Sequence, residues 1–529
     1  MIAAARVGVA CLVVSAAVGG PGARAAQPAP EEPPATPAAF SGTTTLISEW
    51  RVDNRNGDAT DDDYGSGVVR SEVLLDGGDT RLGLRFDATG FASRPASGDR
   101  RNDARIERAV LELARARAFG AGPRLGLSLS AGDFYTQFGR GLVLSLRRID
   151  EIGIDIALRG ARVELTAGDL LSLTLLGGVA NPANLEPRRY EHLQDPGDHL
   201  AGARVELRGD RGVLGVHAAG AREADPPLPI PVPDDFTIGY GGSLDASVGP
   251  AGIGLDVARQ ERRRAGGHER GHAVYATATI PIHATTLLVE FKHYGTFDRL
   301  RGSRTSAGDQ RFLYSLPPTA ERSDQELLDN TDITGGRLRA DQALPWGASS
   351  AYASLGVFAD RTFDQWFSHG FAGYERRWDG GAVFFASGGY RREWNRQGGA
   401  LARAIAHAET DVTLPLREGV SAHIVARHES HAIPLGATDR YVFHLGTAAL
   451  EINIATRLSV AGAYEYDNQR RVPGVAQRFG FGLVKWRTGD RLTLQLLAGT
   501  QKGGVRCLAG ACTIQPPFAG VRLDAALRF

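Results

Sequence analysis

The sequence predicts an all-β protein made of a single large transmembrane antiparallel β-barrel of about 24 strands, with short turns at one end and long loops at the other. Three observations predict this fold. Polar and apolar residues alternate through most of the chain from Phe40 onward, with little helical periodicity. No linker divides this long region into domains of ordinary size, and the final strand alternates up to an aromatic last residue. Lipid leaves unpaired backbone groups without partners, so such a sheet must close.

The first residues predict export and divide the chain into three parts. Residues 1–25 carry Arg6, an apolar run over 7–18 and a small-residue cleavage site, which together are typical of a secretory signal peptide. The run is shorter than the roughly 20 residues that a spanning helix needs. Residues 26–41 are Pro-rich and predict an extended periplasmic tail, so the barrel is expected over 42–529.

Alternation within individual segments predicts which side chains share a face. In the segment 81–89, Arg85 and Asp87 lie on one face, whereas Leu84 and Phe86 lie on the other. The segments 203–208 and 337–341 repeat this pattern of charged and apolar positions. Each segment therefore predicts a strand with a polar face toward the barrel interior and an apolar face toward lipid.

The C-terminal stretch "FAGVRLDAALRF" carries the strongest single signal. It places an apolar series on one face and charged residues on the other, and it ends at Phe529. This stretch resembles the closing strand of Gram-negative outer-membrane β-barrels, although no specific characterised family is identified. The resemblance implies location in the bacterial outer membrane, outer-membrane lipids and the barrel-assembly machinery as partners, and Phe529 as the assembly signal that this machinery reads.

The lengths of the connections predict the orientation. In such barrels periplasmic turns are short, external loops are long, and both termini are normally periplasmic. Stretches such as "RTGD" and "WDGG" fall where short turns are due. The segments after Glu261, Asp360, Arg391 and Ser430 fall where external loops are due, as does the longest connection, 296–331.

Counting strands from both ends assigns the stretch from Asp133 to Ile152. The strand "PRLGLSLSAG" before it should point outward and the strand "GIDIALRGARVEL" after it should point inward. An additional strand between them would break the parity. Asp133 to Ile152 is therefore predicted to be the third external loop, which gives the even total of about 24 strands.

The third loop contains the predicted pore constriction. Its position resembles that of the third loop of diffusion porins, which folds into the barrel and narrows it. Opposed basic and acidic groups in a constriction sort solutes by charge and size. The residues expected to form it are Arg140, Arg147, Arg148, Asp150 and Glu151. An ordinary surface loop is the alternative, in which "LVLSL" could pair with a strand.

Two cysteines, Cys507 and Cys512, lie in the last external loop and are predicted to form a disulfide in an oxidising compartment. A metal site fits less well because no His partners lie nearby in the sequence. The His residues of "RHESHA", His428 and His431, lack metalloprotease spacing and face opposite ways on a strand. No metal and no cofactor are expected.

Charge and motifs exclude other classes of function. Sixty basic and 60 acidic residues give a formal net charge of zero, which argues against nucleic acid as a partner. Neither G-x-S-x-G nor a P-loop nor C-x-x-C-H occurs, so no enzymatic activity is expected. The Pro-rich tail is too short to form the folded plug of a TonB-dependent receptor.

These observations favour a porin-like channel for passive diffusion of small polar solutes, narrowed by the third loop. Two alternatives stay open. One is a scaffold barrel that holds a separate lumen-filling protein, such as a multihaem cytochrome, a lipoprotein or a secreted substrate, because a barrel of about 24 strands is wide enough to need filling. The other is a surface receptor or adhesin, for which the long external loops are the evidence.

Overall fold

The structure is a computed structural model. It describes residues 39–57, 59–93, 101–118, 124–149, 153–186, 191–224, 236–264, 267–304, 311–318, 331–395, 400–435, 439–469, 475, 477–508, 511–515 and 517–529. The predicted signal peptide, residues 1–25, lies outside these residues, as does the Pro-rich tail up to residue 38. In the described part no helix is long and apolar enough to cross a membrane.

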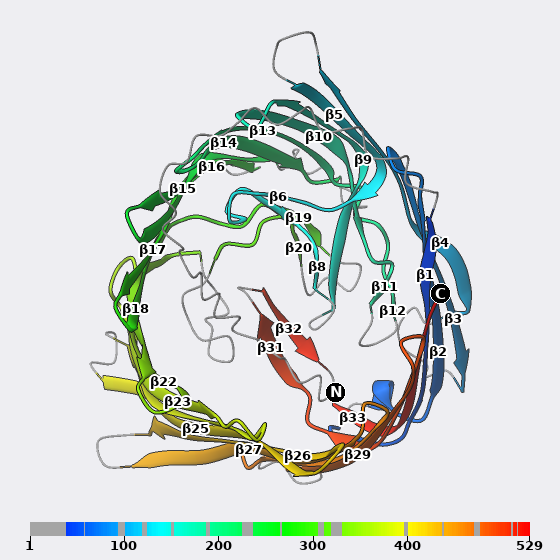
Figure 1. Ribbon diagram of the computed structural model, residues 1–529, viewed down its shortest axis with the longest axis vertical. Helices are drawn as coiled ribbons and strands as arrows, with labels where there is room; N and C mark the ends of the chain where they lie inside the picture. The colour runs from blue at the N-terminus through cyan, green and yellow to red at the C-terminus, as the bar shows by residue number, and fades with distance from the viewer. Residues whose placement is uncertain are drawn as a thin grey trace, which may run out of the picture.

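Most strands belong to one closed antiparallel barrel (Figure 1). The barrel strands are β1 (Ala39–Arg51), β2 (Gly65–Asp76), β3 (Thr80–Ala92), β4 (Asp103–Ala118), β5 (Arg124–Phe134), β9 (Ile154–Ala167), β10 (Leu171–Pro182), β13 (His199–Gly209), β14 (Gly212–Arg222), β15 (Phe236–Val248), β16 (Ala251–Arg264), β17 (Gly267–Ile282), β18 (Thr285–Gly295), β21 (Ile333–Leu344), β22 (Ala348–Asp360), β23 (Gln365–Arg377), β24 (Val383–Asn395), β25 (Ala400–Arg417), β26 (Val420–Pro434), β27 (Arg440–Ile454), β28 (Leu458–Asp467), β29 (Arg478–Thr488), β30 (Leu492–Gln501) and β33 (Phe518–Arg528).

Several shorter elements lie in the connections between barrel strands. They are the 3-10 turn η1 (Ala59–Asp61) and the strands β6 (Thr136–Phe138), β7 (Leu144–Leu146), β8 (Arg148–Ile149), β11 (Leu185–Glu186), β12 (Glu191–His192), β19 (Arg301–Arg304), β20 (Arg311–Leu313), β31 (Gly504–Leu508) and β32 (Ala511–Gln515). β8 is hydrogen-bonded to β9 and is counted in the 25-stranded sheet, so 24 strands form the barrel itself.

The first and last strands close the barrel. β1 pairs with β33, with Leu46 opposite Ala525. β5 pairs directly with β9, with Gly132 opposite Gly160, so the connection 135–153 contributes no strand to the barrel wall. The prediction of a closed antiparallel barrel of about 24 strands is therefore confirmed.

The two faces of the wall differ as the alternation predicts. On β3, Arg85 and Asp87 are each only 4 % exposed on the inner face, whereas Leu84 and Phe86 on the outer face are 40 % and 42 % exposed. Side chains that reach the outer surface of a membrane barrel must be apolar, since lipid surrounds it. The outward series of large apolar side chains recurs on most strands.

The six Trp residues lie near the two rims of the barrel. Three lie at the end where the longer connections emerge: Trp50, Trp366 and Trp394. Trp366 stacks on Trp394, with ring centroids 3.6 Å apart. The other three lie at or beside the short turns of the opposite end: Trp346, Trp378 and Trp486. This distribution is typical of the aromatic girdles at the two interfaces of a membrane.

Some of the expected external loops are shorter than predicted because the strands continue. β16 ends at Arg264 and β17 begins at Gly267, so the segment after Glu261 is mostly strand. Charged side chains pair along this extension, as with Glu261 and Arg270, whose Oε1 and Nε lie 3.8 Å apart. The connections that follow Asp360, Arg391 and Ser430 are short in the same way and cover only 361–364, 396–399 and 435–439. On β16 and β17 the cross-strand ladder continues past Glu261 to the pair Arg264 and Gly267.

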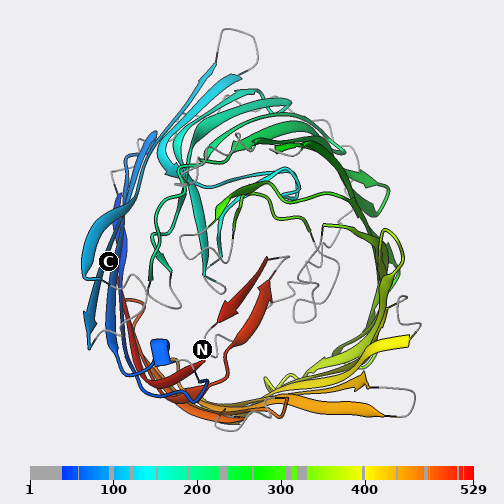
Figure 2. The same ribbon diagram turned by 180° about the vertical axis from the view of Figure 1, so that it is seen from behind.

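An inner layer of connections occupies part of the lumen. β6 and β7 from the connection 135–153 and β19 and β20 from the connection 296–332 lie within the ring of strands in both views (Figures 1 and 2). Their apolar side chains form one cluster with inward residues of the wall, which include Leu200, Ala219 and Tyr275. The lumen is therefore partly filled by the chain itself.

Candidate functional site in the barrel lumen

The connection 135–153 packs against the inner wall formed by β13 to β16. The ring of Phe138 is fully buried, and its centroid lies 6.0 Å from that of His217 on β14. The guanidinium of Arg204 on β13 lies over the same ring, 5.6 Å from its centroid. Gly202 leaves room for this ring, since a Cβ at that position would come within 2.9 Å of Phe138 Cε2.

The tip of this connection is held by two carboxylates of the wall. The backbone N–H of Arg140 donates to Asp256 Oδ2 at 2.6 Å, and the Arg140 guanidinium forms an ion pair with Asp245. Gly139 and Gly141 flank the tip with φ of 52° and 93°. A side chain is strained at such angles, and a Cβ on Gly139 would approach Asp256 to 2.9 Å.

The connection 296–332 covers the tip from the other side. Leu316 N–H donates to the carbonyl of Gly141 at 2.9 Å, and Ser145 N–H donates to the carbonyl of Tyr314 at 2.7 Å. The two connections thus form a single layer, although they are far apart in the sequence. The sequence predicts an inward fold for the third connection and, for the connection 296–331, only that it is the longest external loop.

Asp198, which precedes β13, anchors this second connection and is fully buried. Its carboxylate accepts hydrogen bonds from the Tyr314 hydroxyl at 2.5 Å, the Ser303 hydroxyl at 2.5 Å and the Ser303 N–H at 2.8 Å. It also accepts one from Ala224 N–H at 2.8 Å. Burial, and next the charge of Asp198, raise the pKa of Tyr314, so this phenol stays protonated and remains a donor.

The structure separates the predicted constriction residues. Arg140 lies at the tip beside β15 and β16, as described above. Arg148 lies at the opposite end of the connection, where Nη1 is 2.5 Å from Glu72 Oε1 on β2. Arg147 is partly buried, and burial lowers its pKa from the usual value for arginine. Asp150 and Glu151 lie outside the described residues. The structure therefore does not bring the three arginines together at one point.

Asp155 at the start of β9 joins the connection to the charged wall. Arg85 Nη1 and Arg108 Nη2 lie 2.5 Å and 3.1 Å from its two carboxylate oxygens. The Tyr135 hydroxyl donates to Asp155 Oδ1 at 2.7 Å. Because all these groups are paired, this side of the lumen is polar but carries little unbalanced charge.

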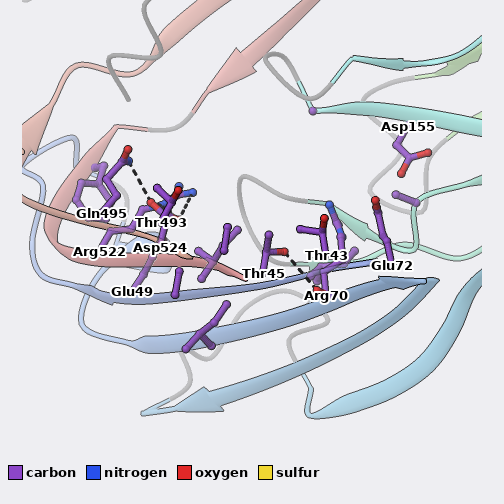
Figure 3. Close-up of a pocket in the computed structure, with 18 of the residues that line it drawn as sticks. Thr43, Thr45, Glu49, Arg70, Glu72, Asp155, Thr493, Gln495, Arg522 and Asp524 are labelled. Carbon is purple, nitrogen blue, oxygen red and sulfur yellow. Dashed lines mark hydrogen bonds and ion pairs between the residues drawn. The ribbon is translucent and has the colours of Figure 1, made fainter. Parts of the chain in front are cut away.

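A pocket with a volume of about 510 Å³ faces the lumen between this connection and the closing strands β1, β2, β30 and β33 (Figure 3). Arg522 contributes a cation to its wall, with Glu49 and Asp524 at 3.1 Å and 2.8 Å. Gln495 and Arg70 also line it. The lining thus combines amide, hydroxyl and paired charged groups with apolar side chains such as Ile47, Ile154 and Phe518.

Several of these residues could not be found from the sequence. Asp198, Asp245 and Asp256 look like any other acidic residue in an alternating strand or a loop. An inward position could be predicted for Asp245 and Asp256 from their period, but not the contact with a distant segment. Within the described residues, no group of three or more His, Cys, Asp or Glu could hold a metal ion.

The backbone places Cys507 opposite Cys512 in the hairpin of β31 and β32. This register is compatible with the predicted disulfide, which stays a prediction. Phe529 follows β33 at the short-turn end, where its N–H donates to the carbonyl of Gly42 at 3.1 Å. Its ring stacks on Phe40, with centroids 5.5 Å apart.

Residues 119–192 match the model of a family of unknown function, DUF6029. No curated protein sequence matches the chain. Among solved structures, the chain is similar to the siderophore receptor PirA from Pseudomonas aeruginosa, with 10% identity and a TM-score of 0.46 over 94% of this chain and 81% of that chain. It is also similar to the copper transporter OprC (12% identity, TM-score 0.43, 94% of this chain and 81% of that chain) and to the translocation pore of the P pilus usher PapC (10%, 0.40, 93% and 99%). These similarities assign no ligand to this chain.

A closed antiparallel barrel with an apolar outer face, a polar inner face and Trp residues at both rims defines the class of protein. The chain is an outer-membrane β-barrel protein of the Gram-negative type, and it is located in the bacterial outer membrane.

Proposed function

We propose that the protein is an outer-membrane channel for passive diffusion of small polar solutes, narrowed by the connection 135–153. The observation that carries this proposal is the packing of this connection inside the lumen, where its tip contacts Asp245 and Asp256 of the wall. A segment confined to the outer surface would not place its backbone N–H against Asp256, a buried carboxylate of the inner face.

The remaining lumen supports the same function. Many inward side chains of the closing strands are charged or polar, and Arg522, Gln495 and Glu72 line the pocket there. Water and small solutes favour such a surface, because polar groups replace part of their hydration shell. The paired charges favour discrimination by size and weak discrimination by charge.

Planar-bilayer recordings on the purified barrel test this function. The wild type should show discrete single-channel conductance. Replacement of residues 136–149 by a short Gly/Ser linker should raise this conductance, because it removes the part of the inner layer that contains β6 and β7. Absence of conductance in both proteins would remove the passive-channel proposal and favour a barrel filled by a partner protein. Equal conductance in both would keep the channel but reject the narrowing role.

The charge of the connection is tested separately. Replacing Arg140, Arg147 and Arg148 by Gln leaves Asp245 and Glu72 without their cations. The lumen then gains uncompensated negative charge, so the reversal potential in a salt gradient should shift toward cation preference. Arg339→Gln is the matched control, since Arg339 faces the lumen on β21 and pairs with Asp341 away from this connection.

A further inference from the structure

The outer wall of β26 to β29 carries a group of polar residues near one rim of a largely apolar surface. Alternation along these strands turns Ala426, Leu450, Val460 and Val484 outward, as expected for contact with lipid tails. Near the rim where the longer connections emerge, the outward side chains include a guanidinium, two imidazoles and a phenol. We call these four residues the outer-wall patch: His428, His444, Tyr466 and Arg478.

Strand register brings the patch together. His428 lies opposite Gly446, Gly446 opposite Tyr466, and Tyr466 opposite Arg478, so these positions form one row across four strands. The Tyr466 ring crosses Gly446, where a Cβ would come within 2.4 Å of Tyr466 Cε1. Its hydroxyl hydrogen-bonds to His428 Nδ1. The Gly at this position is therefore required for the contact.

Two members of the patch, His428 and Arg478, are exposed, whereas His444 and Tyr466 are half-buried, and Arg478 gives the patch a fixed positive charge. The His428 ring stacks on that of His444, with centroids 5.4 Å apart, and both face away from the lumen. Arg478 is exposed, and across the described part of β26 to β29 no outward position is acidic. A guanidinium without an acidic partner at a membrane rim attracts an anion.

The surface beside the patch is apolar. Toward the short-turn end the outward positions of the same strands include Leu450, Tyr464 and Val484, which are 48 %, 45 % and 41 % exposed. Smaller outward residues such as Ala426 and Gly462 accompany them, and a Cβ on Gly462 would meet open space. Acyl chains can pack against this apolar surface, next to a headgroup held by the patch.

We infer that the outer-wall patch binds the phosphate of a phosphorylated glycolipid of the outer leaflet, lipid A, while its acyl chains lie on the apolar surface beside the patch. Arg478 supplies the cation, and His428 and Tyr466 supply hydrogen-bonding groups to the phosphate oxygens or the sugar hydroxyls. The choice of leaflet follows from the prediction that the longer connections are external. Tyr466 is the last but one residue of β28 and Arg478 is the first of β29, which places the patch at that rim.

The test measures binding of purified full-length barrel in detergent, without divalent cations, to three lipids: bisphosphorylated lipid A, enzymatically dephosphorylated lipid A and phosphatidylglycerol. The shift of the heat-modifiable band reports the temperature at which the barrel unfolds. The readout is the lipid concentration that raises this temperature. Wild type should bind bisphosphorylated lipid A most tightly. The double variant Arg478→Gln/His428→Gln should bind it roughly 10-fold more weakly, as expected for the loss of a charge-assisted hydrogen bond.

Two variants serve as controls. Arg376→Gln removes a half-buried Arg on β23 at the opposite rim, where its guanidinium lies over Trp378, and should bind lipid A like the wild type. Arg478→Lys keeps the charge and should retain most of the affinity. Both must show the folded band at low temperature, as must the double variant.

Three outcomes would overturn the inference. The first is equal affinity of the double variant and the wild type. The second is equal binding of dephosphorylated lipid A or phosphatidylglycerol, which would mean that the acyl chains or any anionic lipid suffices. The third is a change in oligomeric state of the double variant in size-exclusion chromatography with light scattering, which would identify the patch as a contact between copies of the chain.

Discussion

The guanidinium of Arg140 pairs with the carboxylate of Asp245, 105 residues further along the chain. This ion pair links the tip of the connection 135–153 to β15, and the Asp256 carboxylate beside it accepts the Arg140 backbone N–H. A flexible loop that is fixed in this way has one position in the lumen rather than many. In the proposed channel, this ion pair sets how far the connection narrows the lumen.

Breaking this ion pair should make the channel noisier. In Arg140→Gln the tip loses its charge pair, a loss of about 1 kcal/mol for a pair of this exposure, so the connection should visit positions away from the wall. Single-channel recordings should then show a higher mean conductance with frequent sub-states. Arg339→Gln, remote from the tip, should leave the recordings unchanged. Steady openings in Arg140→Gln would mean that the remaining contacts fix the tip.

Asp198 should matter more than any single contact of the tip. Asp198→Ala removes the acceptor for the Ser303 and Tyr314 hydroxyls and for two backbone N–H groups, all in a fully buried site. Buried donors without acceptors cost about 1–3 kcal/mol each, so the segment 301–304 should open locally. Hydrogen exchange should show faster labelling of 301–304 and 311–316, with the barrel strands still protected.

Asp195→Ala is the matched control for this experiment. It lies in the same connection, but its recorded contact is one hydrogen bond from Asn184 Nδ2 at 3.0 Å. Its exchange pattern should stay close to that of the wild type. Slow exchange at 301–304 in Asp198→Ala would show that the apolar cluster around Phe297 and Leu300 holds the segment without this carboxylate.

The barrel could be predicted from the sequence because each wall residue obeys a local rule. Arg85 and Leu84 take opposite faces whatever the rest of the chain does, and the direct pairing of β5 with β9 follows from parity alone. The lumen could not be predicted in the same way. Asp245 and Asp256 alternate like residues that face water, and only the fold shows that Arg140 meets them.

The orientation of the barrel is open to a labelling experiment. In a background with Cys507→Ser and Cys512→Ser, single cysteines at Asp62 and Asp439 lie at the end with the longer connections, whereas cysteines at Gly380 and Gly489 lie in the short turns. An impermeant thiol reagent should label the first two on intact cells and the last two only after the outer membrane is broken. The reverse pattern would invert the orientation and move the outer-wall patch to the inner leaflet.

The cysteine pair has a direct chemical test. The register that places Cys507 opposite Cys512 predicts that neither thiol reacts with an alkylating reagent in denaturant until a reductant is added. Mass spectrometry should show no alkylation before reduction and two additions afterwards. Two additions without reduction would show that no disulfide joins Cys507 and Cys512, so that only backbone pairing connects β31 and β32.

Deletion of Phe529 should lower the amount of folded barrel in the outer membrane. The ring covers Gly42, where a Cβ would lie 2.6 Å from Phe529 Cζ, and it stacks on Phe40 at the seam between the first and last strands. Removing it exposes this seam and takes away the aromatic residue that we expect the assembly machinery to read. Heat-modifiable mobility in membrane fractions measures the folded fraction. Phe529→Tyr keeps an aromatic ring in this position and should assemble at near wild-type levels, whereas Phe529→Ala should behave like the deletion. Normal levels of all three variants would show that the closing strand is recognised through its other residues.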